Sequence, residues 1–253
     1  MVEMLTQERH QIIVSHLKSR GICSVKELCS VTNSSQATIR RDLYELQQKG
    51  KLIRVRGGAR SLDEFSSDVE QTIRFNLHVE EKKQIAQAAA MHVRDGDNIF
   101  IDAGTTTYEM IQFLRDKKDL TVVTNGIDAA IACIELGIRT KILGGTIKKK
   151  THATIGTQTC QQLMQFNFNA SFLGSNGLGS NGCYTTPDCA EADIKKQAVD
   201  CSKVTFILMD KSKIGIESFV NFAKVESVTL ITDQLTEMDK KKIPKKTNIE
   251  EIN

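Results

Sequence analysis

The stretch Ser34-Ser35-Gln36-Ala37-Thr38-Ile39-Arg40-Arg41-Asp42-Leu43 has the pattern of an amphipathic helix with a basic outer face. Ser34 or Ser35 can cap its first amides, and Ile39, Leu43 and Leu46 recur at the spacing of a buried stripe. At about 100° per residue, the opposite face carries Ala37, Arg40, Arg41, Tyr44 and Gln48. Guanidiniums, a phenol and an amide can contact base edges and phosphates, so the pattern predicts a DNA-recognition helix that ends at Gly50.

The residues before this helix complete a helix-turn-helix. Ser24-Val25-Lys26-Glu27 has the spacing of a capping box and predicts a short helix, which only Thr32-Asn33-Ser34 separates from the recognition helix. A first helix, capped by Thr6 and running to about Lys18, is expected to brace the pair. The three predicted helices therefore have the order of a helix-turn-helix DNA-binding domain.

The residues after Gly50 predict a basic β-wing. Leu52-Ile53-Arg54-Val55-Arg56 alternates, which places Leu52, Arg54 and Arg56 on one face before Gly57-Gly58 turns the chain. The predicted DNA contacts are therefore Ser35, Gln36, Ala37, Thr38, Arg40, Arg41, Tyr44, Arg54 and Arg56.

These motifs resemble those of a known family. Arg9-x3-Ile13-x3-Leu17, the recognition stretch from Ser35 to Leu43, and Gly57-Gly58-Ala59 agree in order and distance with DeoR-type bacterial repressors. The resemblance implies a repressor that binds double-stranded operator DNA. Thr32 and Ser34 stand where this family commonly has aliphatic residues.

Composition and charge fit two domains with different partners. The chain has 253 residues, of which 40% are hydrophobic, and a net charge of +3. Residues 1–60 hold eleven Lys or Arg and five Asp or Glu, a net +6, whereas the remainder holds 23 basic and 26 acidic residues, a net −3. A basic module joined to a mildly acidic one indicates that the first part meets nucleic acid.

Cysteine and histidine spacing gives no sign of a cofactor or metal. The seven cysteines form no C-x-x-C pair, and the five histidines lack metal-ligand spacing, so we expect reduced thiols and no zinc site. No apolar run reaches about 18 residues and no signal peptide begins the chain, which predicts a cytoplasmic protein without membrane contact.

The pattern changes along the chain into three parts. We expect a winged helix-turn-helix domain at 1–60, a polar linker at 61–78 and an α/β domain at 79–253, in which apolar strands alternate with helices. This alternation predicts a mostly parallel sheet covered on both faces. Its expected strands are 98–102, 120–124, 140–143, 170–174, 203–209 and 228–232.

Ligands of such sheets bind beyond the carboxyl ends of the strands. After the first strand, Asp102-Ala103-Gly104-Thr105-Thr106-Thr107 combines a glycine, three hydroxyls and the free amides of a helix start, which predicts an anion cradle. It lacks the lysine of a P-loop, which disfavours a nucleoside triphosphate. The run Lys148-Lys149-Lys150 can contact ligand or form a solvated loop.

Polar residues at the other strand ends indicate a phosphorylated polyol. The predicted effector contacts are Asp102, Gly104, Thr105, Thr106, Thr107, Asn125, Gly145, Asn176, Glu191 and Lys213. The motifs Asp-x-Gly-Thr-Thr-Thr, Thr-Asn, Gly-Gly, Phe-Leu-Gly and Asp-x-Ser-Lys also resemble the effector domain of DeoR-type regulators, which is similar in fold to ribose-5-phosphate isomerases and coenzyme A transferases. The resemblance implies that Gly104 to Thr107 hold a phosphate and that Asn125, Glu191 and Lys213 line the sugar pocket. Asn169 stands where the family usually has Asp.

Two other functions compete with a sugar-responsive repressor. A sugar-phosphate isomerase carrying a DNA-binding module could use Glu191 as its base, but Ser175-Asn176-Gly177 supplies no second carboxylate. An activator or architectural DNA-binding protein would have no need of converging polar strand ends. We therefore expect a non-enzymatic repressor of a carbohydrate catabolism operon that is released by a phosphorylated sugar. Its sensor domains are expected to associate into a homo-oligomer, a dimer or tetramer.

Overall fold

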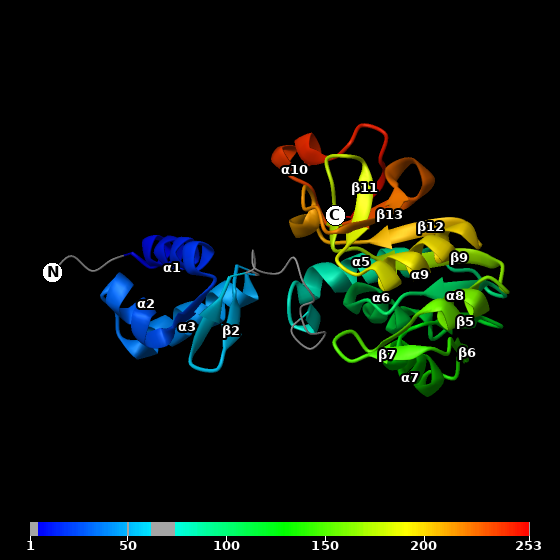
Figure 1. The fold of residues 1–253 in the computed structure, drawn as a ribbon, viewed down its shortest axis with the longest axis horizontal. Coiled ribbons are helices and arrows are strands. Elements are labelled where there is room, and N and C mark those ends of the chain that lie inside the picture. The colour runs from blue at the N-terminus through cyan, green and yellow to red at the C-terminus, as the bar shows by residue number, and fades with distance from the viewer. Residues whose placement is uncertain (1–4, 50, 62–73, 253) are drawn as a thin grey trace. The chain divides into compact units, whose positions relative to one another are not determined.

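The computed structural model describes residues 5–49, 51–61 and 74–252. The chain divides into two compact units, Met1–His78 and Val79–Asn253. Figure 1 shows their helices and strands. The predicted linker at 61–78 falls mostly on residues outside the described part, as does the predicted helix end at Gly50.

The first unit packs three helices against a small antiparallel sheet. The helices are α1 (Thr6–Arg20), α2 (Val25–Thr32) and α3 (Gln36–Gln48). The sheet has the order β1-β3-β2, with β1 at Ile22–Ser24, β2 at Ile53–Val55 and β3 at Gly58–Arg60. Its core contains the predicted apolar stripe of α3 together with residues of α1 and α2, including Ile13, Leu17, Leu28, Ile39 and Leu43. This is the winged helix-turn-helix that the sequence predicts, with β1 as an unpredicted third strand.

Two local predictions in this unit are wrong. Leu5, not Thr6, occupies the N-cap position of α1, and no side chain caps that helix. Leu52 does not share an exposed face with Arg54 and Arg56, because the regular strand begins only at Ile53. Leu52 is instead fully buried in the core.

A buried ion pair fixes α1 to α3. Asp42 is only 2% exposed and accepts from Arg9 Nε at 2.6 Å, from Arg9 Nη2 at 2.9 Å and from His10 Nε2 at 3.1 Å. The acid in the recognition stretch thus faces inward, away from the predicted DNA-contacting face. Two-pronged Arg–carboxylate geometry sets the angle between the helices as well as joining them.

We expect Arg9→Ala to lower the free energy of unfolding of the first unit by about 2–4 kcal/mol, because it leaves the Asp42 carboxylate buried with only His10 beside it. Urea unfolding of the full-length protein, followed by circular dichroism, measures this. Arg20→Ala is the matched control on the same helix, since the Arg20 side chain is 64% exposed in its pair with Glu27 and should cost at most about 1 kcal/mol. If both variants lost the same free energy of unfolding, the Arg9–Asp42 pair would not be the stabilising contact between α1 and α3.

The second unit is built on a seven-stranded, fully parallel sheet of order β15-β14-β12-β9-β4-β5-β6. Its strands are β4 (Asn98–Ile101), β5 (Thr121–Thr124), β6 (Arg139–Ile142), β9 (Phe168–Gly174), β12 (Ser202–Leu208), β14 (Thr229–Thr232) and β15 (Asn248–Glu251). Its larger helices are α5 (Val79–Met91), α6 (Thr105–Met110), α7 (Ile127–Glu135), α8 (Thr157–Leu163) and α9 (Cys189–Asp200). The six predicted strands are confirmed, and β15 at the sheet edge is additional.

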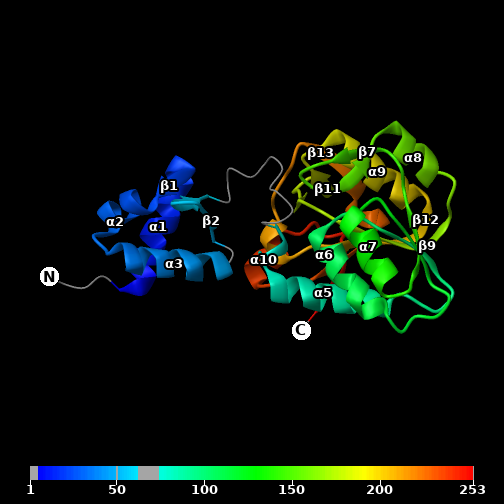
Figure 2. The same cartoon turned by 90° about the horizontal axis from the view of Figure 1, so that it is seen from below.

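Residues of the five inner strands, β14, β12, β9, β4 and β5, enter two separate cores on the two faces of the sheet. Ile99 and Ile101 pack with α5, α6 and α7, whereas Phe100 between them packs with α8 and α9. Figure 2 shows α5, α6 and α7 on one side of the sheet and α8 and α9 on the other. Both faces are therefore covered, which explains the nearly continuous apolar strands.

The sequence analysis missed the antiparallel parts of this unit. These are the hairpin of β7 (Thr146–Lys148) and β8 (Ala153–Ile155), and a small sheet of β10 (Gly177–Leu178), β11 (Cys183–Thr186) and β13 (Val220–Lys224). The terminal helix α10 (Glu237–Lys242) and the 3-10 turns Lys211–Lys213 (η2) and Val225–Ser227 (η3) were also not predicted, whereas the 3-10 turn Ile111–Leu114 (η1) continues the helix expected after the first strand. All of these elements are two to six residues long, which is too short for a periodic pattern to be recognised.

Asn169 has a structural contact at the amino end of the sheet. Its side-chain Oδ1 accepts a hydrogen bond from Asn98 N at 2.9 Å, where β4 begins. The strand-end site lies at the opposite, carboxyl end of β4. The Asn in place of the family's Asp therefore retains an acceptor for the first amide of β4.

All seven cysteines are free thiols. Burial raises the pKa of Cys133 to about 12, so this core thiol stays protonated at neutral pH. Among the residues that the structure describes, no helix is long and apolar enough to cross a membrane.

Candidate DNA-binding face and sensor site

The outer face of α3 carries the predicted contact residues. Ser35 occupies the N-cap position and its Oγ accepts from Thr38 N at 3.1 Å, while the Ser35 and Thr38 hydroxyls share a hydrogen bond of 2.9 Å. Gln36, Ala37, Arg40, Arg41 and Tyr44 are exposed, and Ile39 and Leu43 are buried beneath them. The cap starts the helix at Gln36, so the basic residues lie within its first two turns.

The wing is attached directly to the recognition helix. The Arg54 guanidinium lies over the Tyr44 ring, 5.9 Å from its centroid, and Arg54 N donates to Gln47 Oε1 at 2.9 Å. Arg54 and Arg56 are exposed. Tyr44 and Arg54 therefore support each other on a single surface formed by helix and wing.

A groove of about 550 Å³ runs between the start of α3 and the wing. Lys26, Arg40 and Arg54 line it together with the backbone of Gly57 and Gly58. Three cations around one groove favour a phosphate of a nucleic-acid backbone. Lys26 was not among the predicted DNA contacts. Its position in the short helix predicted before the recognition helix could have indicated it.

The turn of the helix-turn-helix accommodates both unusual residues. Thr32 is 2% exposed, and its hydroxyl donates to Leu28 O at 2.7 Å. The buried hydroxyl therefore has a hydrogen-bond partner within its own helix. Asn33 adopts a left-handed conformation with φ 49°, which Asn tolerates, and ends α2. Ser34 Oγ donates to Thr32 O at 3.0 Å. Thr32 and Ser34 are thus compatible with the tight turn.

In the second unit, a buried ion pair ties two strand ends to α9. Lys195 Nζ pairs with Asp102 Oδ2 and donates to Gly174 O at 2.9 Å, while Gly174 N donates to the same Asp102 oxygen at 3.2 Å. Both charged side chains are 7% exposed. Lys195 thus neutralises the Asp102 carboxylate directly beside the predicted anion cradle, at Gly104.

Gly104 precedes the first turn of α6, which Thr105, Thr106 and Thr107 begin, and Gly104 N donates to Asp102 O at 2.8 Å. Gly104 is the N-cap residue and supplies no capping side chain. Thr107 Oγ1 accepts from Gly104 N at 3.0 Å and donates to Asp102 O at 2.7 Å, which fixes the loop entering the helix. Thr105, Thr106 and Thr107 are all buried. A helix start without a capping side chain favours an external anion.

Asn125 positions this loop. Its Oδ1 accepts from Ala103 N at 3.2 Å and its Nδ2 donates to Thr154 O at 3.3 Å, so the amide joins the loop to β8. At 2% exposure it is almost fully buried. In this arrangement both ends of the Asn125 amide bond to protein.

Glu191 is the centre of a second polar cluster, four residues before Lys195 on the same face of α9. Its Oε1 accepts from Lys148 Nζ and from Thr151 Oγ1, each at 3.1 Å, and its Oε2 accepts from Thr186 Oγ1 at 3.4 Å. Thr186 Oγ1 also lies 3.3 Å from Asn176 Oδ1. The cluster therefore joins β7, β11 and α9.

Lys148 is the least exposed member of the lysine run. Its side chain is 12% exposed and also pairs with Asp188 at 3.0 Å, whereas Lys149 and Lys150 are exposed. Burial alone would raise the pKa of Asp188, but hydrogen bonds from Glu191 N and Lys148 Nζ hold that pKa below its ordinary value. Sequence reasoning left Lys148 undecided and missed Asp188, although the Asp188-x-x-Glu191 spacing at a helix start was a usable signal.

Gly145 and Lys213 have local structural roles. Gly145 has φ 151°, and a Cβ there would come within 2.1 Å of Thr159 Oγ1, so this position needs glycine for the turn into β7. Lys213 Nζ lies 3.5 Å from Asp210 Oδ2 within its own 3-10 turn, η2. Their predicted roles at the effector remain predictions.

These two units define a class of protein, a winged helix-turn-helix joined to an α/β domain whose strand ends gather hydroxyl and charged side chains. The family model described as DeoR-like helix-turn-helix domain matches residues 9–65, and the model described as DeoR C terminal sensor domain matches residues 77–234. The chain belongs to the DeoR family of DNA-binding transcriptional regulators.

Individual relatives agree along most of the chain. The uncharacterized HTH-type transcriptional regulator FruR of Bacillus subtilis (strain 168) is 40% identical over 235 residues, which cover 93% of this chain and 94% of the relative. The lactose phosphotransferase system repressor of Staphylococcus epidermidis (strain ATCC 12228 / FDA PCI 1200) is 33% identical over 241 residues, 92% of this chain and 94% of the relative. Among solved structures, a D-ribose-5-phosphate isomerase in complex with phospho-erythronic acid matches with a TM-score of 0.41 and 20% identity, over 53% of each chain.

Proposed function

We propose that this protein is a sequence-specific repressor of a carbohydrate catabolism operon and that a phosphorylated sugar releases it from DNA. The observation that carries the proposal is the surface shared by α3 and the wing, where Arg40, Arg41, Tyr44 and Arg54 are exposed on capped and cross-braced elements. Side chains held on rigid elements suit base and phosphate contacts in a major groove.

Two copies are needed to contact both halves of a two-fold operator. We assign oligomerisation, as a dimer or tetramer, to the sensor unit, because it has the larger core and leaves the small first unit free to meet DNA. Sedimentation of the full-length protein measures the state directly. A monomer at the concentration that binds operator would contradict this part of the proposal.

The sensor site is proposed to hold the phosphate on the amides of Thr105 to Thr107 and the sugar hydroxyls near Asn176 and Glu191. The Glu191–Lys148 pair and the Asp102–Lys195 pair support this assignment, since both put charged groups around one end of the sheet. If effector and operator favour different arrangements of the dimer, each weakens the other by the same factor. A coupling of about 1–3 kcal/mol corresponds to roughly 5- to 150-fold.

We propose binding without catalysis. Isomerisation would require Glu191 to act as a free base, yet its two carboxylate oxygens already accept from Lys148, Thr151 and Thr186. Asn176 supplies an amide where a second acid would assist. Incubation of the wild type with ribose 5-phosphate should produce no ketose. Ketose formation by the wild type that is lost in Glu191→Gln would contradict this assignment.

We expect one phosphorylated sugar to raise the melting temperature of the full-length protein, while its unphosphorylated partner does not. At about a hundred times its dissociation constant, a ligand adds roughly 2.7 kcal/mol, which is about 5–10 °C for a unit of this size. The measurement is a thermal shift across paired sugars and sugar phosphates, and the hit is then tested for release of a selected operator fragment. If each sugar and its phosphorylated form shifted the melting temperature equally, the phosphate group would play no part in recognition.

A further inference from the structure

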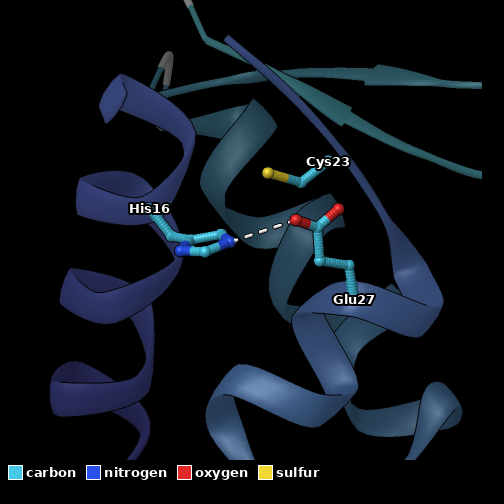
Figure 3. Close-up of side chains that lie close together, drawn as sticks. All are labelled: His16, Cys23 and Glu27. Atoms are coloured by element: carbon cyan, nitrogen blue, oxygen red, sulfur yellow. Dashed lines mark hydrogen bonds and ion pairs between the residues drawn. The ribbon is translucent and has the colours of Figure 1, made fainter. Parts of the chain in front are cut away.

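Three metal-ligating side chains meet in the first unit, outside both sites described above. His16 comes from α1, Cys23 from β1 and Glu27 from α2, and Figure 3 shows the three side chains directed toward one another. His16 Nε2 and Glu27 Oε1 are 3.4 Å apart, and the ligand atoms of all three lie within 4.8 Å of one another. No metal site was predicted from the sequence, because the spacing of these residues matches no standard motif. Folding, not spacing, brings them together.

The geometry is close to that of a tetrahedral site. Metal bonds of about 2.0–2.3 Å place neighbouring donor atoms roughly 3.3–3.8 Å apart. The His16–Glu27 separation already falls in this range. The thiol must approach by at most about 1 Å to reach the same range. Cys23 is held in β1 by its pairing with Ala59, so the more exposed side chains of His16 and Glu27 make this adjustment.

The donor set selects the class of ion. A sulfur, an imidazole nitrogen and a carboxylate oxygen suit Zn²⁺ and similar divalent transition metals, whereas Ca²⁺ and Mg²⁺ prefer oxygen alone. Cys23 is 2% exposed and closes the inner side, while the His16 and Glu27 side chains are 21% and 31% exposed and give access from solvent. Three protein ligands leave a fourth position open to water.

One neighbouring cation must be accommodated. Arg20 Nη1 lies 2.9 Å from Glu27 Oε1, and its side chain is 64% exposed. It can turn into solvent or move to the second carboxylate oxygen when Oε1 binds the ion. An exposed pair of this kind contributes little to stability, and far less than the coordination of a structural zinc ion does.

We propose that His16, Cys23 and Glu27 bind a divalent transition-metal ion of the Zn²⁺ class, with water as the fourth ligand. On binding, the Cys23 S–H bond breaks, its proton passes to solvent, and a metal–thiolate bond forms. The ion then links α1, β1 and α2. Because α2 packs on α3, the metal stiffens the support of the recognition helix.

Cobalt(II) is the probe, because thiolate coordination gives a near-ultraviolet charge-transfer band and tetrahedral geometry gives visible bands. The full-length reduced protein should show both bands, saturating at one equivalent and displaced by Zn²⁺. Cys23→Ser should remove the charge-transfer band. Cys29→Ser is the matched control, since this half-buried thiol lies on α2 and outside the cluster, and it should keep the band.

His16→Gln tests the second ligand and should weaken Co²⁺ binding at least tenfold, with far-ultraviolet circular dichroism verifying that the unit stays folded. Zn²⁺ should also raise the melting temperature of the wild type and of Cys29→Ser, but not that of Cys23→Ser. A band that survives in Cys23→Ser, or a wild type without a saturating band, overturns the proposal. A spectrum unchanged in His16→Gln overturns the assignment of the site.

Discussion

Operator affinity falls by about two orders of magnitude or more when Arg41 is replaced by alanine. Arg41 is exposed on the outer face of α3, six residues after the Ser35 cap. A base contact by arginine is worth roughly 1–3 kcal/mol, and a dimer loses it in both half-sites. The measurement is fluorescence anisotropy of a labelled operator fragment, with the salt concentration held constant because phosphate contacts depend strongly on it.

The control for Arg41→Ala removes one positive charge from the second unit instead. Lys245 is exposed near the end of the second unit, so Lys245→Ala should leave operator affinity within about twofold. Sugar-phosphate binding, followed by thermal shift, should be unchanged in both variants. If Arg41→Ala bound operator with full affinity, Arg41 would not be part of the recognition surface. If Lys245→Ala lost as much operator affinity as Arg41→Ala, the loss would be due to net charge and not to a specific contact.

Thr106→Arg should give a protein that binds operator normally and no longer responds to the effector. Thr106 is 3% exposed in the first turn of α6, so a long cationic side chain must occupy the space that the phosphate is proposed to fill. Thr106 belongs to the second unit, so the change should leave the core and the DNA contacts of the first unit intact. Operator release is measured against effector concentration, where the wild type should respond and the variant should not at a hundredfold higher dose.

Two further variants separate a blocked site from a misfolded one. Thr106→Ser keeps the hydroxyl and should respond like the wild type. Gly104→Ala is milder than Thr106→Arg, since its Cβ would lie 3.0 Å from Thr107 Oγ1 and 3.7 Å from Gly174 Cα, at the start of the cradle. It should shift the effector response by at least tenfold. A normal response in Gly104→Ala and Thr106→Arg together would place the effector elsewhere.

The DNA-binding unit was predictable because its signals are local. Ser35 caps α3 through Thr38 N, and Ile39 and Leu43 turn inward, as their spacing along the helix predicts. Both effects act within one or two helical turns, so a short stretch determines them. The alternation of the six predicted strands with helices in the second unit followed for the same reason.

The sensor site was only partly predictable, because its contacts cross between elements far apart in the sequence. The strand-end rule indicated Asp102 and Glu191, but nothing local shows that Lys195 would pair with Asp102, 93 residues earlier. The run of three lysines likewise does not distinguish Lys148, which β7 and β8 turn inward, from its two exposed neighbours. Burial and pairing of a side chain depend on all elements packed around it.

By itself, the sequence determined the helix-turn-helix and the mostly parallel sheet of the second unit, because periodicity and capping are short-range properties. Only the tertiary structure decided that Asp42 faces Arg9 instead of DNA, that Glu191 gathers Lys148 and Thr151, and that His16, Cys23 and Glu27 meet. Each of these contacts depends on the packing of separate elements. The residues next to a charged side chain or a thiol in the sequence do not show which partner it will meet in the folded protein.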